Sequence, residues 1–201
     1  MDRLHAIRLK QSSKPAIWKD PYGGYLDFVT QANQPTYLRC YIGQSYEPKD
    51  RIPQHIREIL KGSKYSLHYY IINNKNNRYA NFIRLWTVPF PPRINNLVKL
   101  VFENFLEMVM CRIFQSLPLS SLEEIFGPCP NGQYSGLGLN VISPLLQGRS
   151  LSPYSRHKVV QLLSTSPDFE IREWALYRNS ENHQLSRMLN SKELPNDKTY
   201  G

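Results

Sequence analysis

The sequence predicts a small α/β (α+β) protein, with a mostly antiparallel three-stranded sheet flanked by helices and a short helical C-terminal extension. Two runs rich in aromatic and β-branched residues flank a turn signal between residues 25 and 45, which is typical of a β-hairpin. Apolar residues then recur at helical spacing, and a third alternating run precedes a long segment without internal Gly or Pro. These features indicate one main domain.

The elements follow in this order. The first is the hairpin, because Asn33 and Pro35 in the stretch ANQP favour a turn between the two runs. A helix of about three turns comes next, with Asp50 as its predicted cap and Gly62 as its stop. The segment KYSLHYYII fits either a short helix or a strand, and its periodicity leaves both open. The run NFIRLWTV then alternates as a third strand does.

A long helix follows in NNLVKLVFENFLEMVMCRIFQSLP, which is apolar around most of its circumference. We therefore expect it to be largely buried, capped by Asn95 or Asn96 and ended at Pro118. Its glutamates, Glu103 and Glu107, lie one turn apart on the least apolar side. They are the carboxylates that this helix offers to a site.

The C-terminal part is expected to add two short helices, each opened by Ser-Pro, with Ser152 and Ser166 as caps and Pro153 and Pro167 at the first helical positions. We divide the chain into a basic N-terminal segment (1–21), a main domain (22–145), a helical extension (146–178) and a disordered tail (179–201).

The charge is uneven along the chain. The 201 residues contain 25 basic and 16 acidic side chains, for a net charge of +9. Through Lys99 there are 16 basic and 6 acidic residues, whereas the remainder is nearly neutral. A basic half favours a polyanionic partner such as DNA, and its structural alternative is a soluble basic surface without a partner.

Other classes of protein are disfavoured. Cys40, Cys111 and Cys129 are odd in number and widely separated, which argues against a structural zinc site or a disulfide framework. The first residues contain no apolar run of the length expected for a signal peptide, and no later run is long enough for a membrane span. We expect an intracellular protein without a membrane partner, and leave the nucleus and organelles open as its location.

One group of residues has the types and the spacing of a catalytic site. YIG at residues 41–43 falls on the second expected strand, Arg51 follows on the next helix, and His55 completes an Arg-x-x-x-His arrangement. Residues three and four apart are neighbours on a helix, so Arg51 and His55 share a face. This arrangement resembles the GIY-YIG nuclease family over roughly residues 22–145.

The match departs from the family in its first signature. GIY is absent as written, and the nearest stretch is GGY at residues 23–25. It sets Tyr25 across the hairpin from Tyr41 if the turn centres on Asn33, although a register slip of one residue would remove Tyr25 from the site. Asn140 in GLN is similar to the asparagine that often closes the domain of this family.

The resemblance implies a Mg²⁺-dependent endonuclease acting on DNA, that is, a metal-binding hydrolase. Glu107 would hold Mg²⁺ or Mn²⁺, and Glu103 is the alternative ligand. A single carboxylate suits Mg²⁺, which prefers oxygen ligands and keeps several waters. No small-molecule cofactor is expected.

The remaining roles follow from the same resemblance. Arg51 would bind phosphoryl oxygens through its planar fork, and Tyr41 or Tyr25 would relay a proton from water. His55 would support that transfer or contact the phosphate, with a titration in its ordinary range of about 6 to 7. Each side chain also has a structural alternative, as a strand aromatic or a solvated helix residue.

Further DNA contacts are expected from Arg57, Lys61 and Lys64, beside Arg51. Two other functions compete with the nuclease. One is a catalytically inactive GIY-YIG-fold module that binds nucleic acid, which the altered first signature favours. The other is a protein-interaction scaffold, for which the nearly neutral C-terminal half is the motivation. The sequence leaves the oligomeric state and the DNA substrate open.

Overall fold

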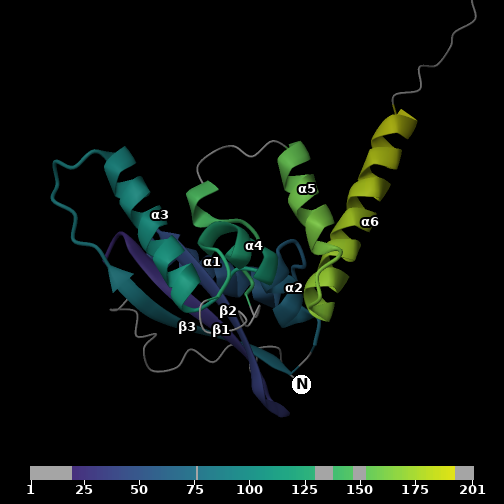
Figure 1. Ribbon diagram of the computed structural model, residues 1–201, viewed down its shortest axis with the longest axis horizontal. Coiled ribbons are helices and arrows are strands. Elements are labelled where there is room, and N and C mark those ends of the chain that lie inside the picture. Colours follow the sequence, from purple (N-terminus) through teal and green to yellow (C-terminus); the bar gives the residue numbers. More distant parts are fainter. Residues whose placement is uncertain (1–19, 76, 130–137, 147–152, 193–201) are drawn as a thin grey trace, which may run out of the picture. The chain divides into compact units, whose positions relative to one another are not determined.

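A computed structural model of the protein (Figure 1) describes residues 20–75, 77–129, 138–146 and 153–192. Most of the expected N-terminal segment lies outside these stretches. The chain divides into two units, residues 1–150 and 151–201, which are described one at a time. Within the described stretches, no helix combines the length and the apolar character that crossing a membrane requires.

The first unit contains a three-stranded antiparallel sheet in the order β2-β1-β3. Its strands are β1 (Gly23–Gln31), β2 (Gln34–Ser45) and β3 (Arg78–Thr87). Ala32 and Asn33 form the turn of the β1–β2 hairpin, as the Asn and Pro signal predicted. The predicted α+β class with a small antiparallel sheet is confirmed at this level.

Helices α1 (Pro48–Leu60) and α2 (Leu67–Asn73) pack against each other. Helix α1 starts before the predicted cap, because Pro48 opens the helix and Asp50 lies in its first turn. Helix α2 is the segment that periodicity left open. The hydroxyl of Ser66 accepts a hydrogen bond from the Tyr69 backbone N–H at 3.2 Å, which is the capping bond that starts a helix.

Helix α3 (Asn96–Ile113) begins where the sequence predicted. The Asn95 side chain caps it by accepting from the Leu97 backbone N–H at 2.7 Å. The helix ends at Ile113, before the predicted stop at Pro118, because Gln115 adopts a positive φ of 48°. A residue in that conformation cannot continue a right-handed helix.

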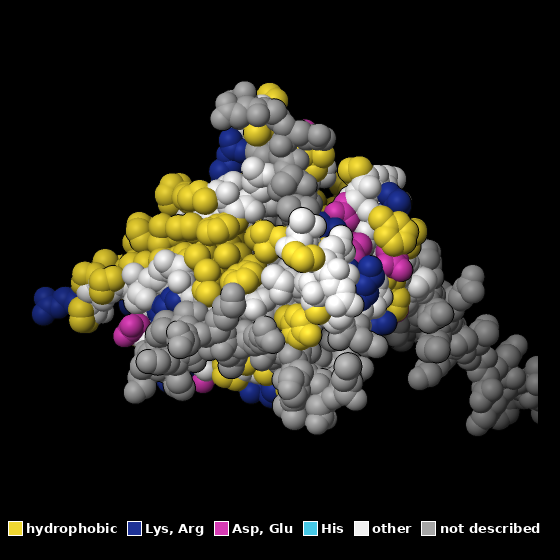
Figure 2. Space-filling model, turned by 90° about the horizontal axis from the view of Figure 1, so that it is seen from below, with side chains coloured by type: hydrophobic (Ala, Val, Ile, Leu, Met, Phe, Trp, Pro, Cys, Tyr) yellow, Lys and Arg dark blue, Asp and Glu magenta, His cyan; other side chains and the backbone are white. Residues whose placement is uncertain are grey.

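The prediction that α3 is largely buried is wrong. The inward side carries polar groups, and the buried ones are Lys99, Glu103, Asn104 and Glu107. The exposed side is apolar and includes Leu97, Val98, Leu100, Val101, Phe102, Phe105 and Ile113. Figure 2 shows hydrophobic side chains gathered in a broad band on the face that it draws. A helix that is apolar nearly all round gives no periodic signal for the side that faces inward.

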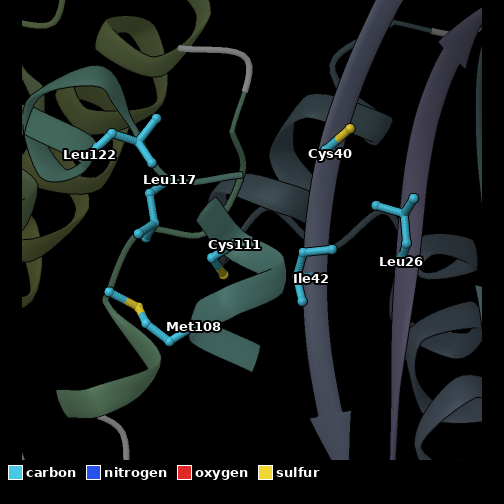
Figure 3. Close-up of a cluster of buried hydrophobic side chains, with 7 residues drawn as sticks. All are labelled: Leu26, Cys40, Ile42, Met108, Cys111, Leu117 and Leu122. Carbon is cyan, nitrogen blue, oxygen red and sulfur yellow. The ribbon is translucent and has the colours of Figure 1, made fainter. Parts of the chain in front are cut away.

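The hydrophobic core of the first unit lies between the sheet, α3 and α4 (Leu119–Phe126) (Figure 3). The buried cluster consists of Leu26, Cys40, Ile42, Met108, Cys111, Leu117 and Leu122. Because side chains alternate along a strand, Tyr25, Asp27 and Tyr41 point to the opposite face. That face is the one on which α1 and α2 supply side chains.

A short segment, residues 138–140, runs beside the outer edge of β2. The Asn140 side chain is buried, accepts from the Ile42 backbone N–H at 2.8 Å and donates to the Ile42 carbonyl at 2.6 Å. It therefore satisfies the edge of β2 as a paired strand would. A turn of 3₁₀-helix, η4 (Pro144–Leu146), follows.

The second unit contains α5 (Pro153–Leu163) and α6 (Phe169–Lys192), which pack against each other. The predicted helix start at Pro153 is confirmed, whereas the predicted start at Pro167 is wrong, because α6 begins at Phe169. The cap of α6 is Asp168, whose carboxylate accepts two backbone N–H groups of the first turn at 2.9 and 3.1 Å. Ser166, the predicted cap, instead accepts from the Asp168 backbone N–H.

The predicted disordered tail, residues 179–201, begins too early in the chain, because α6 continues through Lys192. Polar side chains in this stretch bond to neighbours three and four residues away, as Glu181 does with Arg178 and Tyr177. Such pairs support a polar helix. The rest of the predicted tail lies outside the described residues.

Candidate active site

The Tyr25 side chain lies over Gly43, its partner in the register of β1 and β2. A Cβ atom at Gly43 would come within 2.5 Å of the Tyr25 Cζ and Oη atoms, so glycine leaves room for the phenol. Tyr41 precedes Gly43 by two residues and lies on the same face, with its ring centroid 6.4 Å from that of Tyr25. The hairpin register therefore brings the tyrosines of GGY and YIG together.

The altered position of the first signature, Gly24, is filled from β3. Trp86 pairs with Gly24 across the sheet, and a Cβ atom at Gly24 would come within 2.0 Å of the indole ring. The indole occupies the space that an isoleucine side chain would take at this position. The Trp86 indole thus fills the volume that is lost when glycine replaces isoleucine in the first signature. Tyr25 keeps its position next to Gly24.

His55 of α1 joins two tyrosines. Its Nε2 atom lies 2.6 Å from Tyr25 Oη, and its Nδ1 atom lies 2.8 Å from Tyr69 Oη. Burial lowers the pKa of His55 to about 2, and His68 and Arg51 add to the shift. The imidazole is therefore neutral at pH 7, so that one nitrogen accepts from a phenol while the other donates. The expected titration between about 6 and 7 is wrong, because this side chain is buried.

Tyr41 packs against a buried Asp27–His68 pair that could not be predicted from the sequence. Its ring stacks on the His68 ring, with centroids 4.4 Å apart and planes at 7°. His68 Nε2 lies 2.6 Å from Asp27 Oδ2, and Asp27 Oδ1 accepts from the Asn81 backbone N–H at 2.7 Å. This chain of contacts through β1, β3 and α2 fixes the orientation of the Tyr41 ring.

The Arg51 guanidinium acts electrostatically on both Tyr25 and Tyr41, and its Nη1 atom donates to Gln54 Oε1 at 2.7 Å. Burial, followed by the neighbouring Tyr41, raises the pKa of Tyr25 well above its usual value, and Arg51 acts against that rise. Burial likewise raises the pKa of Tyr41, with a further contribution from Glu107. Both phenols therefore keep their protons at pH 7. Arg51 and Tyr41 are half-buried, so they are the members of this group that meet solvent.

The two glutamates of α3 have different neighbours. Glu107 is 1% exposed and interacts electrostatically with both Tyr25 and Tyr41. Glu103 is 2% exposed, and its Oε2 atom accepts from the Trp86 indole N–H at 3.1 Å. Of the two glutamates, Glu107 is the one whose charge acts on both tyrosines, and this favours Glu107 over Glu103 as the metal ligand.

The donor set near Glu107 suits a hard cation. Across the described residues, no group of three or more His, Cys, Asp or Glu side chains is placed to hold a metal ion. One carboxylate with phenol oxygens nearby does not match the nitrogen and sulfur ligands that zinc takes. It matches Mg²⁺ or Mn²⁺, because Mg²⁺ keeps several waters and is typically bound through one or two carboxylates.

The other predicted DNA contacts lie outside this group. Arg57, Lys61 and Lys64 are exposed, on α1 and in the loop that follows it. Lys61 forms an ion pair with Glu58 at 3.2 Å, and an exposed pair of this kind is weak. The structure does not bring these cations to the tyrosines as it brings Arg51, so a role for them is confined to the surrounding surface.

Asp27, His68 and Tyr69 are the site residues that sequence reasoning missed. Asp27 follows the GGY signature by two residues, so it shares the face of Tyr25. His68 and Tyr69 lie in the segment left open between helix and strand. The capping signal of Ser66, placed just before that segment, would have favoured the helix. It would also have placed a second histidine near the strands.

Comparisons with known proteins add no family assignment. No protein-family model, no curated protein and no solved structure matches this chain. The likeness to the GIY-YIG family depends on the residues themselves, and membership stays a prediction.

Proposed function

We propose that this protein is an endonuclease that hydrolyses DNA phosphodiester bonds with Mg²⁺ in a GIY-YIG-type site. One arrangement carries the proposal: four elements contribute side chains to a single group, which consists of Tyr25, Tyr41, Arg51, His55 and Glu107. Candidate nucleophile activators, a phosphate-binding cation and a metal-binding carboxylate are the parts that phosphodiester hydrolysis requires.

The hydrogen bonds of His55 suggest a proton path. A water that reaches Tyr25 Oη from the side of the half-buried Tyr41 and Arg51 gives it a proton as the water oxygen bonds to phosphorus. The bond from phosphorus to the leaving oxygen breaks, and that oxygen takes a proton from solvent. Tyr25 passes its own proton to His55 Nε2, and His55 releases the Nδ1 proton toward Tyr69, which is half-buried. A relay suits Tyr25 better than a preformed phenolate does, because the raised pKa of its phenol opposes ionisation.

Arg51 stabilises the negative charge that develops on the phosphoryl oxygens in the transition state. Its guanidinium has several N–H donors in a rigid fork, so it can stay bonded to Gln54 and beside Tyr25 and Tyr41 while other donors bind phosphate. Because Arg51 is only half-buried, it is accessible to a DNA backbone. A cation held in place before the reaction stabilises the transition state without reorganisation.

Glu107 would hold the metal ion, and the bound ion would supply charge neutralisation at the phosphate and the leaving oxygen. The basic first half of the chain, with 16 Lys and Arg against 6 acidic residues through Lys99, supports DNA as the partner. Its charge would bind the backbone phosphates without regard to sequence.

A nicking assay on supercoiled DNA tests the proposal. The wild type should nick with Mg²⁺ and not in EDTA. Tyr25→Phe removes only the hydroxyl bonded to His55, and it should slow nicking about 10²- to 10⁴-fold, the usual share of general acid–base catalysis. Tyr65→Phe, at an exposed tyrosine of the same unit, is the matched control and should nick normally. DNA binding without any Mg²⁺-dependent nicking would replace the nuclease with the inactive binding module.

A further inference from the structure

A pocket of about 370 Å³ lies between the end of β2 and helix α3. Its volume falls in the range of small-molecule sites, about 300 to 1,000 Å³. The lining residues are Tyr22, Gln44, Tyr46, Asn96, Lys99, Leu100 and Glu103. The mechanism proposed above uses none of these side chains.

The Glu103 carboxylate is a group in this pocket that could accept a hydrogen bond from a ligand. The side chain is 2% exposed, and its Oε2 atom is held by the Trp86 indole. Its Oε1 atom is buried and has no hydrogen-bond partner among the described residues. Leaving such an oxygen without a donor is costly, and Glu103 lines the pocket. An N–H group of a ligand in the pocket is therefore the candidate for the missing donor.

The other walls supply a ring surface and a cation. The rings of Tyr22 and Tyr46 meet edge to face with centroids 4.5 Å apart, and Tyr46 is 58% exposed. Lys99 Nζ donates to Tyr22 Oη at 3.1 Å and lies 4.8 Å from the Tyr22 ring centroid. A cationic ligand would be repelled by this ammonium group. The pocket therefore suits a flat ring with N–H donors toward Glu103 and acceptors toward Lys99.

We propose that the pocket takes an unstacked guanine base of the substrate, next to the phosphate that is cleaved, a proposal that rests on the nuclease function. Guanine carries two adjacent donors, N1–H and N2–H, for the Glu103 oxygen, and its O6 and N7 acceptors suit Lys99. The other bases lack two adjacent N–H groups on this edge. Stacking on Tyr46 adds affinity that does not depend on the base.

The position of the pocket fits a base next to the reacting phosphate. Gly43 contacts Tyr25, and the next residue of β2, Gln44, lines the pocket. Strand β2 is an edge strand, so a nucleotide chain that crosses its end reaches both faces of the sheet. Glu103 and Glu107 are four residues apart on α3, about 6 Å along the helix axis, which one nucleotide spans.

The test observes the pocket directly and requires no cleavage. The Trp86 indole N–H is bonded to Glu103, so its NMR resonance, assigned with Trp86→Phe, reports on occupancy in the full chain. GMP should shift this resonance and saturate. IMP, which lacks the N2 amino group, should bind about tenfold more weakly or worse, the usual loss of a hydrogen bond to a charged group. AMP should be weaker still.

Two variants separate the parts of the pocket. Glu103→Gln should bring the ratio of GMP to IMP affinity to about one. Tyr46→Ala changes an exposed residue and should weaken both nucleotides about tenfold, whereas Tyr65→Ala, another exposed tyrosine, should not. If Glu103→Gln fails to fold, the GMP and IMP titrations of the wild type and of Tyr46→Ala decide.

The outcomes distinguish this proposal from the nuclease proposal. Equal binding of GMP, IMP and AMP, or an equal shift with inorganic phosphate alone, would overturn the guanine site even in an active nuclease. GMP-selective binding that Glu103→Gln abolishes, in a protein that does not cleave DNA, would keep the pocket and overturn the nuclease.

Discussion

Replacing Gly43 with Ala tests how the YIG glycine positions Tyr25. A Cβ atom at this position would lie 2.5 Å from the Tyr25 Cζ and Oη atoms, far inside ordinary contact distance. The edge strand is held by its pairing with β1 and by Asn140, so the phenol is the group that moves. Tyr25 Oη then leaves His55, to which it is bonded at 2.6 Å.

The expected magnitude follows from the size of that move. To regain a contact of about 3.5 Å, the hydroxyl shifts by about 1 Å, and a misplacement of this size can cost about 10²-fold in rate. Overpacking of a buried site costs about 1 to 3 kcal/mol of unfolding free energy. We therefore expect single-turnover cleavage to fall about 10²-fold while the variant stays folded and binds DNA.

The assay pairs single-turnover cleavage with thermal unfolding. Gly127→Ala is the control, because Gly127 has a φ of 73° and nothing within 4 Å of an added Cβ atom. It should lose stability through backbone strain and keep the cleavage rate. Wild-type cleavage by Gly43→Ala would refute the view that Gly43 sets the position of the Tyr25 hydroxyl.

Three further predictions follow from the site. Arg51→Lys should cleave about 10²- to 10³-fold more slowly, since an ammonium lacks the planar fork; single-turnover rates at saturating DNA check this, and a near-normal rate would contradict it. The lowered pKa of His55, about 2, should make the free energy of unfolding fall as pH drops below about 6.5, by up to about 1.4 kcal/mol per pH unit. Urea unfolding at several pH values should show that His55→Gln lacks this contribution. The same pH dependence of stability in the wild type and in His55→Gln would contradict it. DNA affinity should fall steeply with salt, and a flat response between two ionic strengths would remove the electrostatic argument.

Much of the fold was predictable because its signals are local. The turn at Asn33, the capping Asn95 and the alternation of the strands each concern neighbouring residues. The side of α3 that is buried could not be predicted, because both faces of this helix are rich in apolar residues. The inward position of Glu103 depends on a distant partner, the indole of Trp86 on β3.

In the candidate site, too, the residues with local sequence signals could be predicted and those brought together from distant segments could not. Tyr41, Arg51 and His55 were predicted together because their spacing is short and motif-like. The Asp27–His68 pair was not, since its members are separated by 41 residues and neither has a sequence signature. The neutral state of His55 also escaped prediction, because it depends on burial, which the sequence of α1 alone does not give.

The most direct test of the proposed nuclease is Mg²⁺-dependent cleavage of a labelled DNA duplex by Glu107→Gln. Glu107 is the buried carboxylate grouped with Tyr25 and Tyr41. Glu124→Gln, which changes an exposed carboxylate of α4, is the matched control. We predict that the wild type and Glu124→Gln cleave with Mg²⁺, and that Glu107→Gln binds the duplex without cutting it. Cleavage by Glu107→Gln at the wild-type rate, or none by the wild type with Mg²⁺ or Mn²⁺, would contradict the assignment.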